Sequence, residues 1–293
     1  MVEGSAMLSG VPRDEQQTSG TNPPWTLCVG WNVAGERAVP ILRGDTVSAI
    51  ACGRGRSRSP VLLRDAAAGW PAVRTWTLEG IRERVGARVV PVVRVTDGLL
   101  GYDARSGMHY DFVPVSAVID ALLDGAAPRW FLTLPPAEHF PELISDLRSH
   151  APVSRAPWSD ARLSLGAAGN TTPIHREIAD NLFTVIRGEK EVALFAPHDS
   201  RRLESFGPLS GAPHISPIDP RSCRLDRHRG IARCTVWRAR VGSGDVLLIP
   251  RGWWHAVRTT RPTVAMGSWW ADGLYALVPM AAGVYKRIFR IRT

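Results

Sequence analysis

The second half of the chain consists of short apolar and β-branched stretches separated by turn residues. Each stretch has the length of a strand, and Gly, Pro, Ser and Asp occupy the intervals. Short strands at this spacing are typical of a sandwich or barrel. The predicted strands are Arg162–Gly166, Asn181–Arg187, Glu191–Phe195, Thr235–Val241, Asp245–Ile249, His255–Thr259 and Thr263–Trp269. The turns predicted between them are Arg187–Glu189, Gly242–Asp245, Arg251–Gly252 and Thr260–Pro262.

The first half mixes helix-like and strand-like patterns. A run of β-branched residues favours a strand, and a Thr just before a helical stretch favours an N-cap. We therefore expect helices and extra strands from this half to pack outside a barrel. The predicted strands are Pro60–Arg64 and Arg88–Val95, and the predicted helices are Trp76–Arg84 with Thr77 as its N-cap, Pro114–Leu123 and Pro141–His150.

Composition divides the chain into a tail, one domain and a second tail. Residues 1–24 are rich in Gly, Ser, Pro and Gln, which is typical of disorder. We expect a single domain over residues 25–273, with its barrel core at about 160–270, and a helical, basic tail at 274–293. The segment Arg201–Ile231 is long, polar and Pro-rich, which is typical of a lid or a binding loop.

Two short segments carry histidines and a carboxylate in a metal-binding pattern. His175 and Glu177 are two residues apart, so a strand would point both side chains to one face. His255 would join them from a distant strand, which a barrel can arrange. Two imidazoles and one carboxylate form the facial triad that binds non-haem Fe(II) and leaves positions open for substrate and oxygen. We call His175, Glu177 and His255 the triad.

Lysine is nearly absent from a basic chain. Of the 36 Lys and Arg residues, only Lys190 and Lys286 are lysines. Lys190 lies at the start of what the pattern predicts as the return strand of a hairpin. A dicarboxylate needs a fixed cation at one end, and an ammonium on a flexible stem is a suitable point charge. Lys190 is therefore a candidate anion-binding residue.

Several short segments around the triad and upstream of it form a recognisable set: Pro60–Asp65, Gly69–Ala72, Gly169–Glu177, Asn181–Lys190, Leu194–Pro197, Gly244–His255 and Ser268–Trp270. Together they resemble the core of the JmjC (cupin-like) Fe(II)- and 2-oxoglutarate-dependent oxygenases, of the small hydroxylase type. The resemblance covers about residues 60–270. It implies a mainly β fold, a double-stranded β-helix (jelly-roll or cupin) barrel with flanking helices from the N-terminal half.

The resemblance also implies site residues. The triad would bind Fe(II). Lys190 would form a salt bridge with the distal carboxylate of the cosubstrate 2-oxoglutarate, and Thr172 would hydrogen-bond the same carboxylate. Asn181 would lie near the cosubstrate, and Ser268 occupies a further position of that pocket. These assignments follow from the matching motif positions in this chain.

Three positions depart from the commonest pattern of the family. Glu177 stands where hydroxylases of the family carry Asp, although the carboxylate is retained. Ser268 stands where Asn is frequent. Arg176 replaces a frequent aromatic residue and, on a regular strand, points away from the metal. We therefore expect Arg176 on the barrel surface or on the substrate side.

The expected function is hydroxylation of an unactivated C–H bond of a small molecule, amino acid or peptide, with release of succinate and CO2. Two alternatives stay open: a metallo-cupin isomerase or dehydratase, and a non-catalytic JmjC-like binding protein. The preference for arginine over lysine suggests a GC-rich genome and an enzyme of bacterial specialised metabolism.

The net charge of +9 is spread over loops and termini, and no nucleic-acid-binding motif accompanies it. We expect a small-molecule or peptide substrate and no sequence-specific nucleic-acid binding. The arginine-rich segment Arg201–Arg229 suits an acidic group on the substrate, because arginine forks match carboxylate geometry. The C-terminal segment is apolar and then basic, which is compatible with a homodimer formed through it.

No apolar run reaches the roughly 18 residues of a membrane span, and the N-terminus has no signal-peptide pattern. We therefore expect a cytoplasmic protein without a membrane partner. The four cysteines form no CxxC pair and predict neither a disulfide framework nor a zinc site. Trp253 and Trp254 are expected to pack in the core. The histidines expected in solvent or in loops are His109, His139, His150, His198, His214 and His228.

Overall fold

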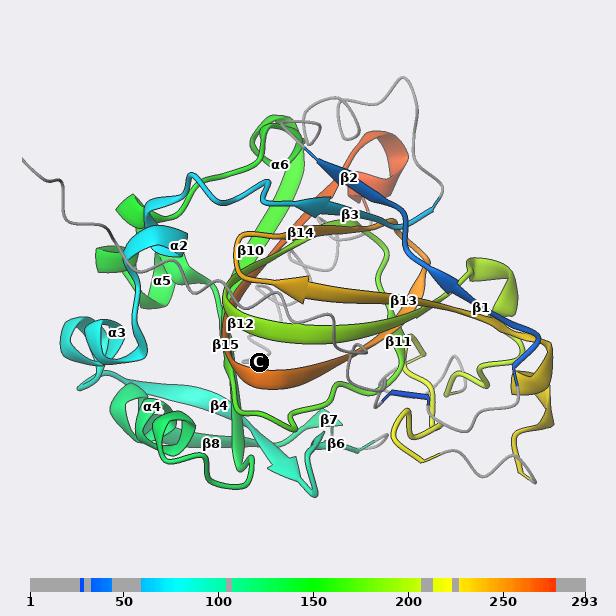
Figure 1. Ribbon diagram of the computed structural model, residues 1–293, viewed down its shortest axis with the longest axis horizontal. Coiled ribbons are helices and arrows are strands. Elements are labelled where there is room, and N and C mark those ends of the chain that lie inside the picture. Colours follow the sequence, from blue (N-terminus) through cyan, green and yellow to red (C-terminus); the bar gives the residue numbers. More distant parts are fainter. Residues whose placement is uncertain are drawn as a thin grey trace, which may run out of the picture.

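Figure 1 shows the computed structural model, which describes residues 27–28, 33–43, 59–103, 107–206, 213–222 and 227–277. The predicted tail at 1–24 and most of the predicted tail at 274–293 lie outside the described residues. The described beginning of the second tail contains a short 3-10 helix, η4 (Gly273–Ala276). Among the helices in these ranges, none is long and apolar enough to cross a membrane.

A mixed sheet of thirteen strands wraps into a jelly roll (Figure 1). Its hydrogen-bonded path runs β2-β3-β14-β12-β15-β10-β9-β4-β5 and does not close on itself. The predicted mainly β, double-stranded β-helix fold is confirmed. The strands of the barrel core are β10 (Trp158–Gly166), β11 (His175–Arg176), β12 (Asp180–Phe195), β13 (Thr235–Gly242), β14 (Val246–Ile249) and β15 (Trp254–Ala271).

The N-terminal half supplies the remaining strands. β1 pairs in parallel with β13 and β2 in parallel with β3, while β4, β8 and β9 extend the sheet beyond β10. These strands are β1 (Gly35–Ala38), β2 (Ile41–Arg43), β3 (Val61–Arg64), β4 (Val89–Thr96), β5 (Leu99–Leu100), β8 (Tyr110–Pro114) and β9 (Trp130–Leu134). A separate two-stranded pair consists of β6 (Tyr102–Asp103) and β7 (Gly107–Met108).

Two long strands cross the barrel where the sequence pattern predicts two hairpins. β12 and β15 pair antiparallel over nearly their whole length. The predicted turns at Arg187–Glu189 and Thr260–Pro262 are wrong, because both segments are bends inside continuous strands, where the register shifts. Gly188 has φ +81°, and a Cβ there would lie 2.2 Å from the carbonyl oxygen of Pro262. The glycine thus marks a bulge and a close approach of two strands, and Lys190 lies just beyond it in the same strand.

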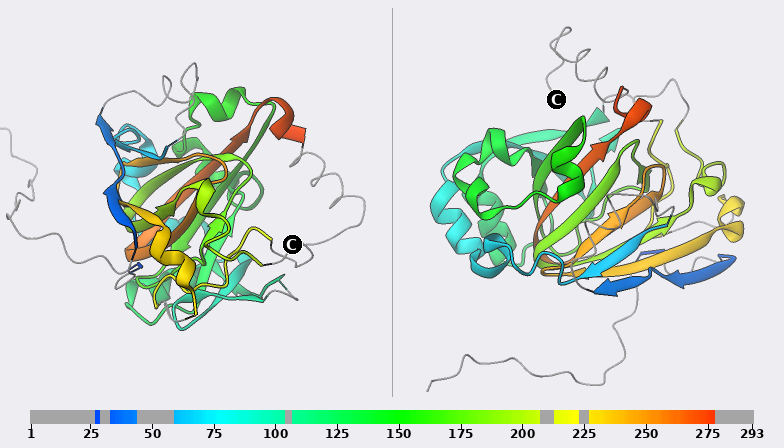
Figure 2. Two further views of the ribbon diagram at one scale, coloured as in Figure 1. Left: turned by 90° about the vertical axis from the view of Figure 1, so that its right-hand side faces the viewer. Right: turned by 90° about the horizontal axis from the view of Figure 1, so that it is seen from above.

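Four short helices, α2 (Pro71–Thr75), α3 (Leu78–Val85), α4 (Val115–Leu123) and α5 (Pro136–His139), gather on one side of the barrel (Figures 1 and 2). The predicted N-cap is confirmed, since Thr77 Oγ1 accepts a hydrogen bond from the Gly80 N–H at 2.9 Å. The helix predicted over Pro141–His150 is wrong in type and length, because a 3-10 helix ends before Leu147, whose backbone is extended. The remaining described helices are η1 (Pro141–Asp146), α6 (Ala151–Arg155), η2 (Pro197–Asp199) and η3 (Arg229–Arg233).

His150 joins this helical side to the barrel. The prediction places it in solvent or in a loop; it lies in the connection before α6 but is buried, because the residue is 7% exposed and its ring centroid is 5.0 Å from that of Trp70. Its Nε2 lies 3.2 Å from Thr184 Oγ1 of β12. Burial lowers the pKa of His150 to about 4. His150 is therefore a neutral core histidine near neutral pH.

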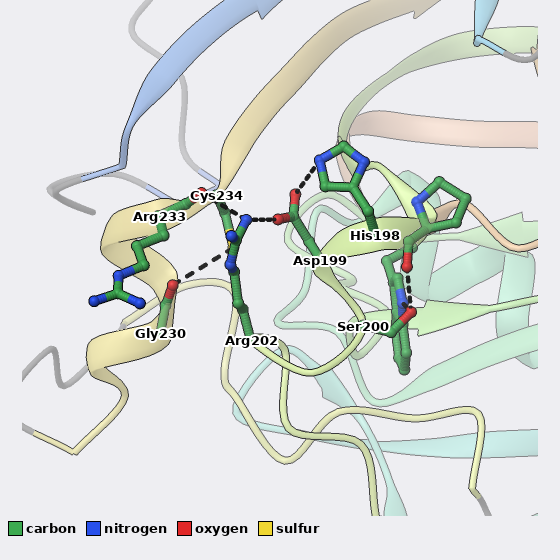
Figure 3. A network of polar contacts seen from close by, with 9 residues as sticks. His198, Asp199, Ser200, Arg202, Gly230, Arg233 and Cys234 are labelled. Atoms are coloured by element: carbon green, nitrogen blue, oxygen red, sulfur yellow. Dashed lines mark hydrogen bonds and ion pairs between the residues drawn. The ribbon is translucent and has the colours of Figure 1, made fainter.

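The connection from β12 to β13 has its two ends tied together (Figure 3). Asp199 is 1% exposed and receives a hydrogen bond from Arg202 Nη1 at 2.5 Å, and the same nitrogen donates to the carbonyl oxygen of Arg233 at 2.9 Å. Cys234 lies beside this pair, and burial raises the pKa of its thiol to about 12. A thiol with so high a pKa is not reactive. The hydrogen bonds of Arg202 therefore have a structural role: they hold the two ends of the connection together.

Candidate functional site

The three side chains of the triad meet in the described structure. β11 pairs antiparallel with β15 so that His175 lies directly opposite His255. The two ring centroids are 4.2 Å apart. One ligand atom from each of His175, Glu177 and His255 lies within 4.8 Å of the others, which is a spacing that can hold one metal ion. Strand pairing, which the sequence pattern left unspecified, brings the distant histidine to the first two residues.

Hydrogen bonds orient both imidazoles. Nδ1 of His175 lies 2.9 Å from the carbonyl oxygen of Pro173, and Nδ1 of His255 lies 3.2 Å from that of Trp253. A carbonyl only accepts, so each Nδ1 carries the proton and each Nε2 keeps its lone pair. Burial lowers the pKa of His175 to about 4 and that of His255 well below its usual range. Both rings are therefore neutral, which is the form that binds a metal.

The Glu177 carboxylate is positioned by polar groups from two strands. Asn181 Nδ2 donates to Glu177 Oε2 at 3.3 Å, and the Trp269 side chain also hydrogen-bonds the carboxylate. The backbone N–H of Ser268 donates to Asn181 Oδ1 at 3.2 Å, which holds the amide in place. Burial raises the pKa of Glu177 to about 7, more than the two hydrogen bonds lower it. A buried carboxylate in this state fits a site completed by a cation.

The sequence placed Trp269 in a motif near the triad but did not predict its contact with Glu177. Trp269 lies opposite Asn181 in the register between β12 and β15, and that register puts its indole beside Glu177. The motif that contains Trp269 is visible in the sequence, but its partner is fixed only by the strand pairing. Trp253 and Trp254, in contrast, are buried as predicted.

Lys190 points into the barrel interior. The residue is 3% exposed, and its Nζ donates to Thr259 Oγ1 at 3.1 Å. The rings of Phe131 and Phe183 lie with their centroids 5.3 and 5.9 Å from the ammonium nitrogen. Within the described parts of the chain, no carboxylate pairs with it. Burial lowers the pKa of Lys190 to about 7. A buried ammonium without an anion is costly, so the site suits an incoming carboxylate.

Thr172 lies along the same stretch of β15. Its Oγ1 accepts a hydrogen bond from the Val257 N–H at 2.8 Å, and its own N–H donates to the Val257 carbonyl at 2.9 Å. Val257 lies between His255 and Thr259 on β15, so Thr172 is located between the triad and the Lys190 contact. The hydroxyl hydrogen of Thr172 is free to donate to a ligand.

A cleft of about 1350 Å³ opens beside the triad. Glu177 and Trp269 lie in its wall, together with Arg176 and Tyr275. Arg176, expected on the surface or on the substrate side, thus lines the cleft next to the triad. Its guanidinium stacks over the Trp254 ring at 5.0 Å and lies 3.5 Å from a serine hydroxyl, and no ion pair joins it to an acid of the described residues.

The other charges of the cleft are already paired. Arg162 lies 3.3 Å from Asp160, and Arg251 lies 2.6 Å from Asp180 and 3.0 Å from Asp272. Two described arginines of the loop that was expected to bind an acidic group are paired internally. These are Arg202, with Asp199, and Arg221, with Asp219. Among the described residues that line the cleft, Arg176 is therefore the cation without an acid partner, and it precedes that loop.

The loop nevertheless forms one wall of the site. Its residues at 213–216 run along β11, where the Arg176 N–H donates to the His214 carbonyl at 2.9 Å and the Ser216 N–H donates to the Ile174 carbonyl at 2.8 Å. His214 also lines the cleft. This part of the loop, predicted only as a lid or a binding loop, therefore pairs with β11 like a short strand. The pairing places it next to His175.

This chain is similar to known proteins over most of its length. A family model described as a cupin-like domain matches residues 55–274. The human bifunctional peptidase and (3S)-lysyl hydroxylase JMJD7 is 27% identical over 251 residues, which cover 72% of this chain and 77% of that protein. The tRNA wybutosine-synthesizing protein 5 of Danio rerio is 25% identical over 237 residues, which cover 73% of this chain and 69% of that protein.

The lysine-specific demethylase 8 of Xenopus tropicalis is 24% identical over 222 residues, which cover 73% of this chain and 48% of the demethylase. This chain therefore spans about half the length of that relative. The family match covers most of the chain, and the triad offers three donors of the type that Fe(II) takes. The chain belongs to the cupin-like family of JmjC type, whose members are oxygenases that use Fe(II) and 2-oxoglutarate.

Proposed function

We propose that this protein is an Fe(II)- and 2-oxoglutarate-dependent oxygenase that hydroxylates an unactivated C–H bond of a peptide or small-molecule substrate. One observation carries the proposal: a neutral two-histidine, one-carboxylate triad shares a barrel interior with Lys190, a buried ammonium that has no carboxylate partner among the described residues. The first feature fits Fe(II), and the second fits one end of a dicarboxylate.

In this proposal the triad holds the iron through Nε2 of His175, Nε2 of His255 and the Glu177 carboxylate. The Nδ1–H bonds to backbone carbonyls fix both ring orientations, as is usual for histidines that bind metals. Asn181 and Trp269 keep Glu177 aimed at the metal, and the raised pKa of this carboxyl falls once a cation is bound beside it.

Lys190 and Thr172 hold the cosubstrate in this proposal. The ammonium pairs with the distal carboxylate, while Thr259 fixes the direction of the lysine side chain. The Thr172 hydroxyl accepts from a backbone N–H and can donate to the same carboxylate. When bound, iron and 2-oxoglutarate supply the oxidising chemistry, with release of succinate and CO2. The protein orients the cosubstrate and keeps water from the Lys190 ammonium, because the aromatic rings of Phe131 and Phe183 lie beside it.

The cleft indicates the kind of substrate. Its size admits a peptide or a drug-sized molecule. Arg176 lies in the wall of the cleft, and its guanidinium has no acid partner in the part of the chain that the structure describes. An unpaired guanidinium attracts a carboxylate and disfavours a cation. The proposed substrate therefore carries an acidic group that reaches Arg176 in the cleft wall, unlike the lysine named for the human and frog relatives.

Two rival functions make different demands on the site. A metallo-cupin isomerase or dehydratase needs a metal but no dicarboxylate pocket, so the buried Lys190 argues against it. A non-catalytic binding protein needs neither oriented metal ligands nor that pocket. The complete triad and the hydrogen bonds that hold it argue against this second rival.

The direct test supplies purified protein with Fe(II), 2-oxoglutarate, ascorbate and panels of acidic, neutral and basic peptides and N-acyl amino acids. We expect succinate release together with a product one oxygen atom heavier, and acidic members should react best. Product formation without consumption of 2-oxoglutarate would favour the isomerase or dehydratase. Absence of any succinate, even uncoupled from substrate, would favour the binding protein. The His255→Ala variant is the negative control for both succinate release and product formation.

A further inference from the structure

Asn170 is a buried residue with an unusual deficit of hydrogen bonds. The residue is 2% exposed, yet neither its amide nitrogen nor its amide oxygen has a hydrogen-bond partner in the described part of the chain. Buried polar groups are almost always paired, and leaving one unpaired costs about 1–3 kcal/mol. An Asn kept at such a position indicates a partner that is not part of the polypeptide.

Strand pairing shows which way the side chain points. Thr171 and Arg258 form an antiparallel bridge, so these two residues share one face. Asn170 and Thr172 flank this isolated bridge, with Thr259 and Val257 across from them in the backbone hydrogen bonds, so their side chains leave the backbone on the other side, where the Thr259 side chain lies. Thr259 is the residue that accepts the Lys190 hydrogen bond. The Asn170 amide therefore faces the interior where the proposed cosubstrate site lies.

Local contacts support the same location. The Asn170 carbonyl accepts a hydrogen bond from the Thr259 N–H at 2.8 Å, so the two residues are directly linked. A Cβ added to Gly166 would lie 3.2 Å from Asn170 Oδ1 and 3.2 Å from two ring carbons of Phe131. The amide thus lies beside the same aromatic ring that contacts the Lys190 ammonium. Gly166 avoids a steric clash with the Asn170 amide, because a larger residue at this position would contact it closely.

We propose that Asn170 is a specificity-determining residue of the cosubstrate pocket, where its Nδ2–H donates to the distal carboxylate of 2-oxoglutarate beside Lys190. This inference rests on the proposed function. A carboxylate accepts up to about four hydrogen bonds, so the ammonium and the Thr172 hydroxyl leave room for an amide donor. The extra donor matters because the ammonium is set in an apolar surround of two phenylalanine rings. The amide adds stabilisation of the carboxylate that does not depend on the lysine.

The test compares two keto acids on Mn(II)-loaded protein, by calorimetry or by relaxation of ligand proton signals. The first is 2-oxoglutarate, and the second is 2-oxopentanoate, which has a methyl group in place of the distal carboxylate. A hydrogen bond to a charged group is worth about 1.5–3 kcal/mol. Asn170→Ala should therefore weaken 2-oxoglutarate binding about ten- to hundredfold and leave 2-oxopentanoate binding within about twofold.

Asn170→Asp should weaken 2-oxoglutarate binding more than Asn170→Ala, because it places a second carboxylate beside the first. Asn170→Ser keeps a small polar side chain and should lie between wild type and Asn170→Ala, which guards against a variant that fails to fold. Ser164→Ala is the matched control, since Ser164 is a buried polar residue of the adjacent β10 that donates to a backbone carbonyl. It should leave both affinities unchanged.

The outcomes separate the inference from the proposed function. If the Asn170 variants weaken both keto acids by the same factor, or neither, then the amide is a structural or water-binding group and the inference is wrong. The proposed function then still stands, provided that the wild-type protein binds 2-oxoglutarate more tightly than 2-oxopentanoate. If wild-type protein fails to select 2-oxoglutarate over 2-oxopentanoate at all, the proposed function fails, and the inference fails with it.

Discussion

His175 and His255 lie directly opposite each other in the register of β11 and β15, with ring centroids 4.2 Å apart. Each ring places its Nδ1 near the carbonyl oxygen of the residue two positions earlier in the chain, Pro173 for one and Trp253 for the other. The two histidines, one on β11 and one on β15, therefore have the same hydrogen bond to the backbone. This repetition leaves both Nε2 atoms available on the same side, which is what a shared metal ion requires.

Removing one of these rings should remove the metal. His255→Ala is expected to weaken Fe(II) or Mn(II) binding by more than about hundredfold, since loss of even an outer-shell partner costs 10–100-fold, and to abolish succinate formation. Metal content after gel filtration and Mn(II) titration measure the effect. His198→Ala is the control, because His198 is an exposed histidine of η2 away from the triad. Normal metal content in His255→Ala would contradict the assignment.

Much of this site could be predicted from local sequence. The segment with His175 and Glu177 predicts a metal face because alternation on a strand is a local rule. The pairing of these residues with His255 followed from the family resemblance, and the cofactors implied by that resemblance are those the family uses. Thr77 was predictable as an N-cap because its hydrogen bond closes within one helical turn.

The errors have a common physical cause. Gly188 beside polar residues has the composition of a turn, yet the strand continues through it with a bulge, because β15 supplies a partner along nearly the whole length of β12. A bulge and a turn require the same residues, and only the long-range pairing distinguishes them. The surroundings of Trp269, Asn170 and His150 could not be predicted for the same reason, since their neighbours come from other strands or helices.

Lys190 should determine the affinity for 2-oxoglutarate. Lys190→Ala leaves the distal carboxylate without its cation, and a charge-assisted hydrogen bond is worth about 1.5–3 kcal/mol. The expected loss of affinity is therefore about ten- to over a hundredfold. Calorimetry with Mn(II)-loaded protein measures it, and Lys286→Ala serves as the control because it is the other lysine of the chain. An unchanged dissociation constant would point to a different cation.

The same residue should make cosubstrate binding depend on pH. Burial lowers the pKa of Lys190 to about 7, and the contacts of its ammonium, Thr259, Phe131 and Phe183, carry no charge. The dianion binds the protonated form, so binding is strongest below about pH 7. Above that pH each further unit should weaken binding about tenfold, because the lysine must first take up a proton. Calorimetry from pH 6 to 9 in buffers of different ionisation enthalpy would show proton uptake, and Lys190→Ala should lose both effects.

Gly188 should be essential for the close approach of β12 and β15. Gly188→Ala adds a Cβ 2.2 Å from the Pro262 carbonyl oxygen at φ +81°. The left-handed backbone costs about 1–2 kcal/mol, and overpacking adds about 1–3 kcal/mol, so we expect a loss of about 2–5 kcal/mol. Gly125→Ala is the matched control, with φ +63° and open space around it, and should lose only the backbone part. Urea unfolding of both variants measures the difference, and equal losses would show that the contact with Pro262 yields easily.

His150 should make the fold sensitive to acid. Its pKa is about 4 in the folded chain, because of burial, against a usual value of 6.5. The unfolded chain therefore binds the proton more readily between pH 6.5 and 4, so this contribution to stability is fully present above about pH 6.5 and is lost as the pH falls toward 4. At 1.36 kcal/mol per pKa unit, the difference between 6.5 and about 4 amounts to a loss of about 3–4 kcal/mol. His150→Gln keeps a donor for Thr184 but cannot titrate, so it should lose less stability than wild type between pH 7.5 and 4.5. Urea unfolding at the two pH values measures this difference, and an identical acid dependence in the two proteins would mean that His150 is protonated in the core without penalty.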